Sequence, residues 1–184
     1  MAFDPPRAFS RAREIRDAQL WDRQRYSGRK AGDLCEIVNH EFLIRESKVD
    51  GNSETSGGLP APRQFLIEGF SAVPSPDVGF NDLSALIEST LFTLTIGDRR
   101  YFQFSGHTVV PLYIQAAIRS FGKWDDKRIA EVWSRPLGPA HLIEPRLVIP
   151  QRCCYRIQAE LYAELLEPAN VTVFLFGKET RAVM

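Results

Sequence analysis

The sequence predicts an all-β protein, an antiparallel β-sandwich of about eight strands. Short runs rich in Val, Ile, Phe, Thr and Tyr recur along the chain, with turns rich in Gly, Pro and Asn between them. Helical periodicity is rare between these runs. The 12 Phe, 5 Tyr and 3 Trp supply the bulky side chains that two packed sheets need in their core.

Size and charge place the chain among soluble globular proteins. Its 184 residues fit one domain, with 44% hydrophobic and 25% charged residues. The formal net charge is zero, which gives no electrostatic case for nucleic acid, an acidic substrate or a membrane as partner of the whole chain. We expect synthesis and retention in a cytoplasm, because no apolar run could span a bilayer and the start lacks a secretory signal.

The first part of the chain differs in charge from the rest. Residues 1–30 hold eight basic and four acidic side chains, so the charge balance elsewhere is slightly acidic. We therefore expect a basic N-terminal arm, 1–33, followed by a sandwich domain, 34–184. Within the arm, the spacing of Ala8, Ala12 and Ile15 predicts a helix over about residues 6–24.

The arginines of this arm have two interpretations. They form a solvated helix face, which is the commoner role of such charges, or they contact a neighbouring subunit or the phosphates of nucleic acid. On the second interpretation the interface residues are Arg11, Arg13, Arg16, Trp21 and Arg25.

The sandwich domain opens with a strand predicted over 34–45. A loop follows at 47–62, where Gly, Ser and Pro are concentrated. A segment of this composition cannot pack into a core. A second strand is predicted over 63–73, and a short helical turn over 81–87.

The strongest local signal is a hairpin. Two β-rich runs, 91–96 and 99–104, are separated by Gly97-Asp98, the two-residue spacing of a tight turn. Beyond it we expect an edge or bulged strand over 109–117, and a short helix or structured loop over 122–135.

The C-terminal part, 140–183, reads as a β-meander. Ile157, Ala159 and Leu161 alternate with polar residues, the period-two pattern of a half-buried strand. With long connections between strands of two packed sheets, a single jelly roll is the leading topology. An immunoglobulin-like sandwich is the alternative, although the Cys to Trp to Cys spacing is missing.

No catalytic or cofactor signature stands out. His40, His107 and His141 are far apart, and none has a second ligand at metal-binding spacing, so we expect neither metal nor cofactor nor enzymatic activity. A metal-dependent cupin-like enzyme is kept as a third hypothesis, since distant histidines can meet in space. The odd set of Cys35, Cys153 and Cys154 is not a disulfide framework.

One cluster supports an alternative function. Tryptophans beside carboxylates could stack on a sugar and cleave or bind a glycan, although two tryptophans fixing a surface loop to the core is the commoner arrangement. The residues of this alternative glycan site are Trp124, Asp125, Asp126 and Trp133.

Over residues 60–183 the order of segments resembles a known family. It comprises the strand Arg63–Gly69, the Gly97-Asp98 hairpin, the segment Pro145–Pro150, the strand Val171–Gly177 and the closing Arg181-Ala182-Val183. This order is similar to that of the small jelly-roll structural proteins of bacteriophage particles.

The resemblance implies a virion structural protein, made in the host cytoplasm and located in the virion. Such a protein would assemble through its jelly-roll body and N-terminal arm into a capsid or capsid-associated homo-oligomer. Its partners would be copies of itself and other virion proteins, with nucleic acid as a further partner of the arm, and it would have no catalytic role.

Overall fold

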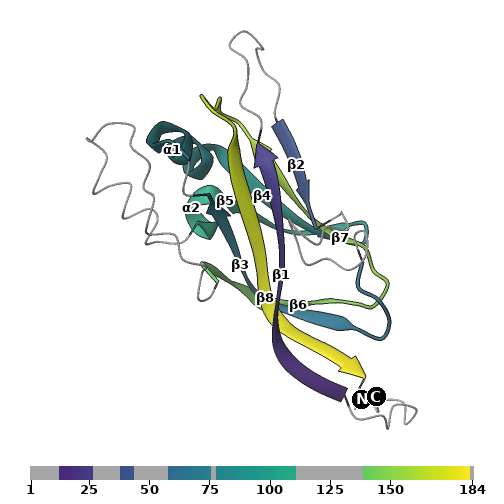
Figure 1. The fold of residues 1–184 in the computed structure, drawn as a ribbon. Helices are drawn as coiled ribbons and strands as arrows, with labels where there is room; N and C mark the ends of the chain where they lie inside the picture. The colour runs from purple at the N-terminus through teal and green to yellow at the C-terminus, as the bar shows by residue number, and fades with distance from the viewer. Residues whose placement is uncertain (1–12, 27–37, 44–57, 76–77, 111–138, 183–184) are drawn as a thin grey trace.

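The computed structural model describes residues 13–26, 38–43, 58–75, 78–110 and 139–182 (Figure 1). This part of the chain contains eight strands and two short helices. The strands are β1 (Arg13–Tyr26), β2 (Val38–Phe42), β3 (Gln64–Pro74), β4 (Thr90–Ile96), β5 (Arg99–Ser105), β6 (His141–Ile149), β7 (Tyr155–Leu161) and β8 (Ala169–Ala182). The helices are α1 (Phe80–Ser89) and α2 (Gly106–Val109).

The strands form two antiparallel sheets of four. Sheet A has the order β1-β8-β3-β6, and sheet B has the order β2-β7-β4-β5. The predicted antiparallel β-sandwich is therefore confirmed. In Figure 1 the long strands β1 and β8 run side by side along the molecule, as their continuous pairing requires.

The pairing order follows a simple rule. β4 pairs with β5, β3 with β6, β2 with β7 and β1 with β8, so the chain folds back on itself at the β4–β5 turn as one long hairpin. Two further pairings, β3 with β8 and β4 with β7, roll this hairpin into two sheets. The predicted turn lies at the centre of the hairpin, and Gly97 has a φ of 59° there, a conformation that favours glycine.

The core lies between the two sheets. Phe70 of sheet A packs against Phe92 and Phe104, with ring centroids 5.6 and 5.5 Å apart. The gap among these rings and their aliphatic neighbours has no room for a water molecule. Each buried Phe contributes about 2 kcal/mol relative to exposure. Around these rings, the described side chains are close-packed and leave no binding cavity.

Strand β1 corrects the prediction for the N-terminal region. The helix expected over 6–24 is wrong for residues 13–24, because Arg13–Tyr26 pairs with β8 along its whole length. The predicted boundary at residue 33 therefore cuts through the sandwich, since one strand of sheet A lies before it. Residues 1–12 lie outside the described part of the chain.

The predicted C-terminal meander is also wrong. β6, β7 and β8 are not neighbours in a sheet: β6 pairs with β3, β7 with β2 and β4, and β8 with β1 and β3. Each connection instead crosses from one sheet to the other. Alternation along a sequence identifies a strand and its buried face, but it carries no information about the partner strand.

The other predicted elements agree in part. The strand at 63–73 and the turn at 81–87 correspond to β3 and α1, and β2 lies within 34–45. Val109 belongs to α2, so the strand predicted from it does not begin there. The remainder of that strand, the segment 122–135 and most of the loop at 47–62 fall outside the described residues.

Candidate interaction site

The predicted interface residues lie on both faces of β1. Arg16 points inward, toward the other sheet, whereas Trp21 and Arg25 point outward, as the alternation of a strand requires. Arg13 is the first residue of β1, and Arg11 lies outside the described residues. The arginines therefore do not converge on a single surface.

The alternative glycan site cannot be located. Trp124, Asp125, Asp126 and Trp133 all lie outside the part of the chain that the structure describes. The glycan hypothesis stays a prediction.

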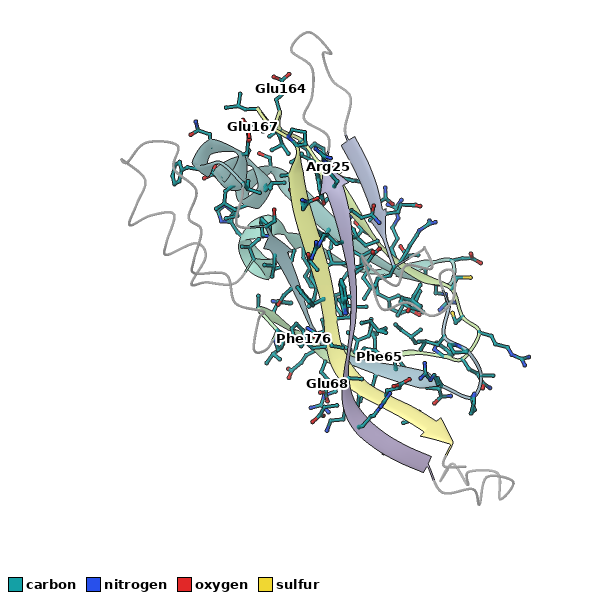
Figure 2. All side chains as sticks on the ribbon, viewed as in Figure 1. Arg25, Phe65, Glu68, Glu164, Glu167 and Phe176 are labelled. Carbon is teal, nitrogen blue, oxygen red and sulfur yellow. The ribbon has the colours of Figure 1, made fainter. Side chains whose placement is uncertain are left out.

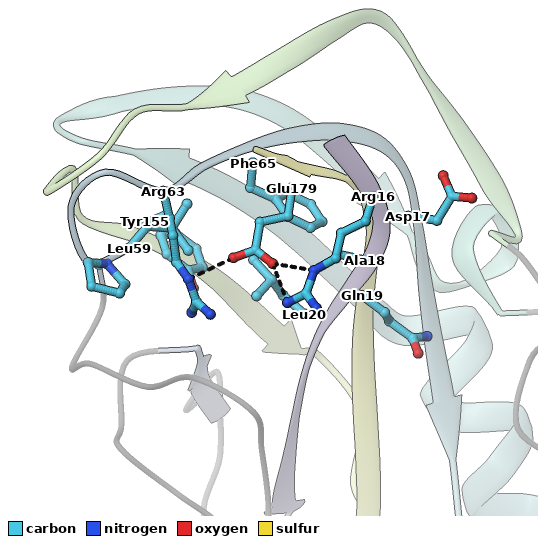
Figure 3. A pocket seen from close by; sticks show the side chains of 12 residues that line it. Arg16, Asp17, Ala18, Gln19, Leu20, Leu59, Arg63, Phe65, Tyr155 and Glu179 are labelled. Carbon is cyan, nitrogen blue, oxygen red and sulfur yellow. Dashed lines mark hydrogen bonds and ion pairs between the residues drawn. The ribbon is translucent and has the colours of Figure 1, made fainter. Parts of the chain in front are cut away.

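Arg16 contributes to an ion-pair pocket at one end of the sandwich. Its Nη2 and Nε donate to Oε2 of Glu179 at 2.9 and 3.2 Å, while Nε of Arg63 donates to Oε1 at 3.0 Å (Figure 3). The Glu179 side chain is only 9% exposed. One buried carboxylate thus joins β1, β8 and the segment before β3, and two guanidinium groups compensate its charge.

The surrounding pocket has a volume of about 320 Å³. Leu59, Phe65 and Tyr155 line it together with the ion-paired side chains, whereas Asp17 and Gln19 point away from the cluster in Figure 3. Because the pocket's charges already satisfy one another across three chain segments, we assign this cluster a structural role. Sequence reasoning could not find it, since Glu179 lies 163 residues from Arg16.

A second carboxylate on the inward side of β1, that of Asp22, connects this strand to sheet B. Asp22 is 2% exposed, and its Oδ2 accepts hydrogen bonds from the Leu43 backbone N–H at 2.7 Å and from Gln24 Nε2 at 3.3 Å. Leu43 follows β2 and has a φ of 65°, an uncommon conformation for a side chain other than glycine. The carboxylate thus links the edge strands of the two sheets.

The histidines do not form a site among the described residues. His107 is exposed on α2, and the ring of His141 on β6 packs against Phe104 at 5.0 Å between centroids. His40 lies in β2 opposite Ala159, and β2 is at the opposite edge of sheet B from β5. In the described ranges, no three His, Cys, Asp or Glu side chains are grouped so that they could hold a metal ion.

The outer face of sheet A, which points away from sheet B, is rich in apolar side chains. Cross-strand pairing arranges its outward positions in rows. From one end of β1 to the other, these rows are Arg23, Thr172 and Val73; Trp21, Phe174 and Ser71; Gln19, Phe176, Gly69 and Leu142; and Asp17, Lys178, Leu66 and Val148.

The outer face of sheet B is polar. Its described rows are Glu160, Leu91 and Ser105; Glu41, Gln158, Thr93 and Gln103; and Arg156, Thr95 and Arg100. Leu91 is the one apolar side chain in these rows, and Tyr101, at the bulge of β5, is a further large side chain that is 42% exposed. Arg156 and Glu41 form an exposed ion pair at 3.5 Å. The outer face of sheet A is therefore the better candidate for an interaction site.

Comparison with known proteins adds no family. No protein-family model, curated protein or solved structure matches this chain. Within the described residues, neither helix has the length and apolar character needed to cross a membrane.

Proposed function

We propose that this chain is a virion structural protein that assembles through a jelly-roll body into a capsid or capsid-associated homo-oligomer. The observation that carries this proposal is the pairing order, in which the first strand pairs with the last and each following strand with the next one inward. A jelly roll is expected to show this order, so the pairing supports that topology. Viral capsid proteins use this fold, as do lectins and cupins.

The packed interior favours a structural role over a cupin-like enzyme. Binding cavities for small molecules usually measure about 300 Å³ or more and hold a few convergent polar groups. At the centre between the two sheets, Phe70, Phe92 and Phe104 leave no space for water. The pocket of about 320 Å³ lies at one end of the sandwich, and the charges of Arg16, Arg63 and Glu179 in it are paired with one another. A packed centre suits a building block that acts through its outer surfaces.

Assembly would use copies of the chain and other virion proteins as partners. Because β1 is part of sheet A, the N-terminal contribution to assembly is assigned to residues 1–12, with nucleic acid as a further partner of that segment. The protein would be made in the host cytoplasm and located in the virion, without a catalytic role.

The test is the mass of the purified protein in solution, measured by light scattering with and without residues 1–12. The deletion stops there because removal of 1–30 would take away the strand that pairs with β8. We expect the full chain to form a large complex and the shortened chain to keep its β-sheet circular dichroism but lose mass. A control chain with residues 1–12 in permuted order keeps the length and charge.

Two results would oppose this proposal. A full chain that stays monomeric up to about 100 µM would contradict self-assembly. If the permuted and native N-terminal segments support assembly equally well, residues 1–12 do not act as a specific contact.

A further inference from the structure

We propose that the loop between β7 and β8, residues 162–168, is the surface on which a neighbouring copy of this chain docks its N-terminal segment, residues 1–12. The inference rests on the proposed assembly function and names the surface that receives the segment assigned to assembly. The contact joins one end of a copy to the opposite end of the next. It is therefore heterologous, and copies linked in this way close into rings or extend into chains.

The outer face of sheet A, although apolar, is largely covered within the chain. Phe174 is 7% exposed, and Ser71 is fully buried. Pro139 packs directly over Gly69. The Ala140 N–H donates to Oγ of Ser71 at 2.6 Å. The central rows of this face are therefore closed to a partner, which must contact apolar side chains elsewhere.

The β7–β8 loop carries the most exposed large apolar side chain in the described ranges, that of Leu166 at 77%. Tyr162, at the start of the loop, is 53% exposed, and Pro168, at its end, is exposed as well. Leu165 is 2% exposed, so the chain buries one leucine and presents the next to solvent. Large exposed apolar side chains grouped in one short loop are a feature of interaction surfaces.

The backbone of this loop is anchored at three points. The Asp82 carboxylate on α1 is 4% exposed. Its two oxygens accept the backbone N–H groups of Leu166 at 2.7 Å and Glu167 at 3.1 Å. At the other end of α1, the Ser89 carbonyl accepts the Tyr162 N–H at 2.9 Å. Because the loop is already fixed, little backbone entropy remains to be lost when a partner binds.

The exposed charges around Leu166 are mainly acidic. Figure 2 shows Glu164 and Glu167 at the end of the sandwich where β8 begins, and Arg25 lies at the same end, opposite Asn170. Apart from buried carboxylates, the charged side chains of the described residues at this end are Glu88, Glu160, Glu164, Glu167, Arg23 and Arg25. Residues 27–37, which join β1 to β2 here, hold two basic and two acidic side chains and leave this balance unchanged. A basic segment with an apolar side chain is the complementary partner.

The N-terminal segment carries this complementary pattern. Arg7, Phe9 and Arg11 are spaced two residues apart, so an extended segment directs all three to one side. An aromatic ring between two guanidinium groups is the counterpart of a leucine between two carboxylates. In the proposed contact Phe9 packs on Leu166, and the two arginines pair with the flanking glutamates.

The segment comes from another copy, because its own loop is too far away. Arg13 pairs with Ala182 at one end of the β1–β8 pair, whereas the loop lies next to Ala169 at the other end (Figure 1). The 14 residues of β1 separate these ends by about 40 Å along the strand. Arg7 lies six residues from Arg13 and can reach at most about 20 Å from it. Arg7 and the two matching side chains after it can therefore meet the loop of a neighbour only.

The first test replaces exposed side chains of the loop and leaves its backbone anchors in place. Leu166→Lys/Glu167→Lys should weaken self-association at least about tenfold in sedimentation equilibrium. The matched control is Leu142→Lys/Glu144→Lys, which makes the same two replacements at exposed positions of β6, at the edge of sheet A farthest from β1. The control should stay within about twofold of wild type. Urea unfolding verifies that both variants are folded. A folded loop variant with wild-type association would overturn the proposal.

The second test uses the head-to-tail character of the contact. A chain without residues 1–12 keeps the loop but has no segment to dock, whereas the loop variant keeps the segment but has no receiving surface. Each alone should be monomeric. An equimolar mixture should form a discrete dimer and nothing larger, since only one contact can form between the two chains. A mixture that stays monomeric at about 100 µM would contradict the proposal.

The third test identifies the occupant by exchanging charges. Arg7→Glu/Arg11→Glu and Glu164→Arg/Glu167→Arg should each weaken self-association severalfold, whereas a chain with all four replacements should return to within about threefold of wild type. Absence of rescue would overturn residues 1–12 as the occupant and indicate a basic segment of another virion protein.

The outcomes separate this inference from the proposed function. If large complexes depend on residues 1–12 but the loop variant still forms them, assembly stands and the loop is the wrong surface. If the mixture forms the expected dimer but the wild-type chain is not incorporated into a particle, the contact stands and the virion role fails. A chain that is monomeric under all conditions contradicts both.

Discussion

The two sheets of this sandwich have similar inner faces and different outer faces. Inward, both supply Phe, Leu, Ile and Val to one core. Outward, sheet B carries Thr, Gln, Arg and Glu, whereas sheet A carries Trp21, Phe174 and Phe176 with aliphatic neighbours. The inner faces account for stability in both sheets. The outer faces differ in composition, largely apolar in sheet A and largely polar in sheet B, which the fold alone does not specify.

The sheets also differ in how their ionic groups are held. In sheet A, Glu179 is buried between Arg16 and Arg63. In sheet B, Glu41 and Arg156 meet in solvent with side chains 41% and 48% exposed. Removing the charge of Glu179 should therefore change stability more than removing that of Glu41, and the differences between the sheets can be tested from the largest effect to the smallest.

The largest effect is expected at Gly177, in the middle of β8. A Cβ at this position would overlap the backbone carbonyl oxygen of Leu66 on β3, so Gly177→Ala must force the two strands apart. We expect a loss of about 3 kcal/mol in the free energy of unfolding by urea. Gly58→Ala is the matched control, because its added methyl would meet the Cys153 carbonyl oxygen at an ordinary 3.6 Å. Equal losses in the two variants would show that close strand approach in sheet A is not the cause.

A smaller effect is expected at Glu179. Glu179→Gln leaves two guanidinium groups around a neutral amide, and we expect a loss of about 2 kcal/mol, less than for a fully buried pair because Arg16 is partly exposed. Glu41→Gln on sheet B should change stability by less than about 0.5 kcal/mol. Urea unfolding of both variants at neutral pH provides the measurement. A larger effect at Glu41 would reverse the contrast between the sheets.

The smallest change in the free energy of unfolding is expected at alkaline pH, where two tyrosines are compared. Burial raises the pKa of the Tyr26 phenol above its ordinary value of 10.0, so the native state holds this proton more tightly than the unfolded chain does. The contribution of this phenol to the free energy of unfolding is fully present below pH 10. It is lost as the pH rises from there, at about 1.4 kcal/mol per pH unit. Tyr26→Phe should remove this slope between about pH 10 and 11.

Tyr162 provides the control. Its hydroxyl donates to Oε2 of Glu160 at 2.7 Å, which raises its pKa, but the side chain is in solvent. Tyr162→Phe should therefore change the alkaline slope of the unfolding free energy less than Tyr26→Phe does. The same slope in wild type and Tyr26→Phe would show that the Tyr26 phenol is not the titrating group.

Local signals predicted the parts of the fold that depend on neighbouring residues. The Gly97-Asp98 hairpin and the alternation in β7 were predictable, because a turn and a half-buried strand are specified within a few residues. Partner strands were not predictable, since the pairing of β1 with β8 joins positions more than 140 residues apart.

Strand β1 escaped prediction for a physical reason. Its inward positions include Arg16, Asp22 and Gln24 beside Ala18 and Leu20, so the apolar alternation is hidden. These polar groups are tolerated inside because Glu179 accepts from Arg16, and Asp22 accepts from the Leu43 N–H and from Gln24. Trp21 and Arg25, predicted as interface residues, lie on the outward side of β1. Phe174, Phe176 and Leu142 were not predicted, because the outward direction of a strand is known only after its sheet is assigned.

The pairing of β1 with β8 also determines the order in which strands can pair while the chain is being synthesised. β8 is the strand between β1 and β3, so β1 cannot take its place in sheet A until β8 has been made, whereas β3 can pair with β6 before then. At roughly 5–20 residues per second, β1 leaves the ribosome about ten to thirty seconds before its partner. The β4–β5 hairpin can close much earlier, since only Gly97 and Asp98 separate its strands.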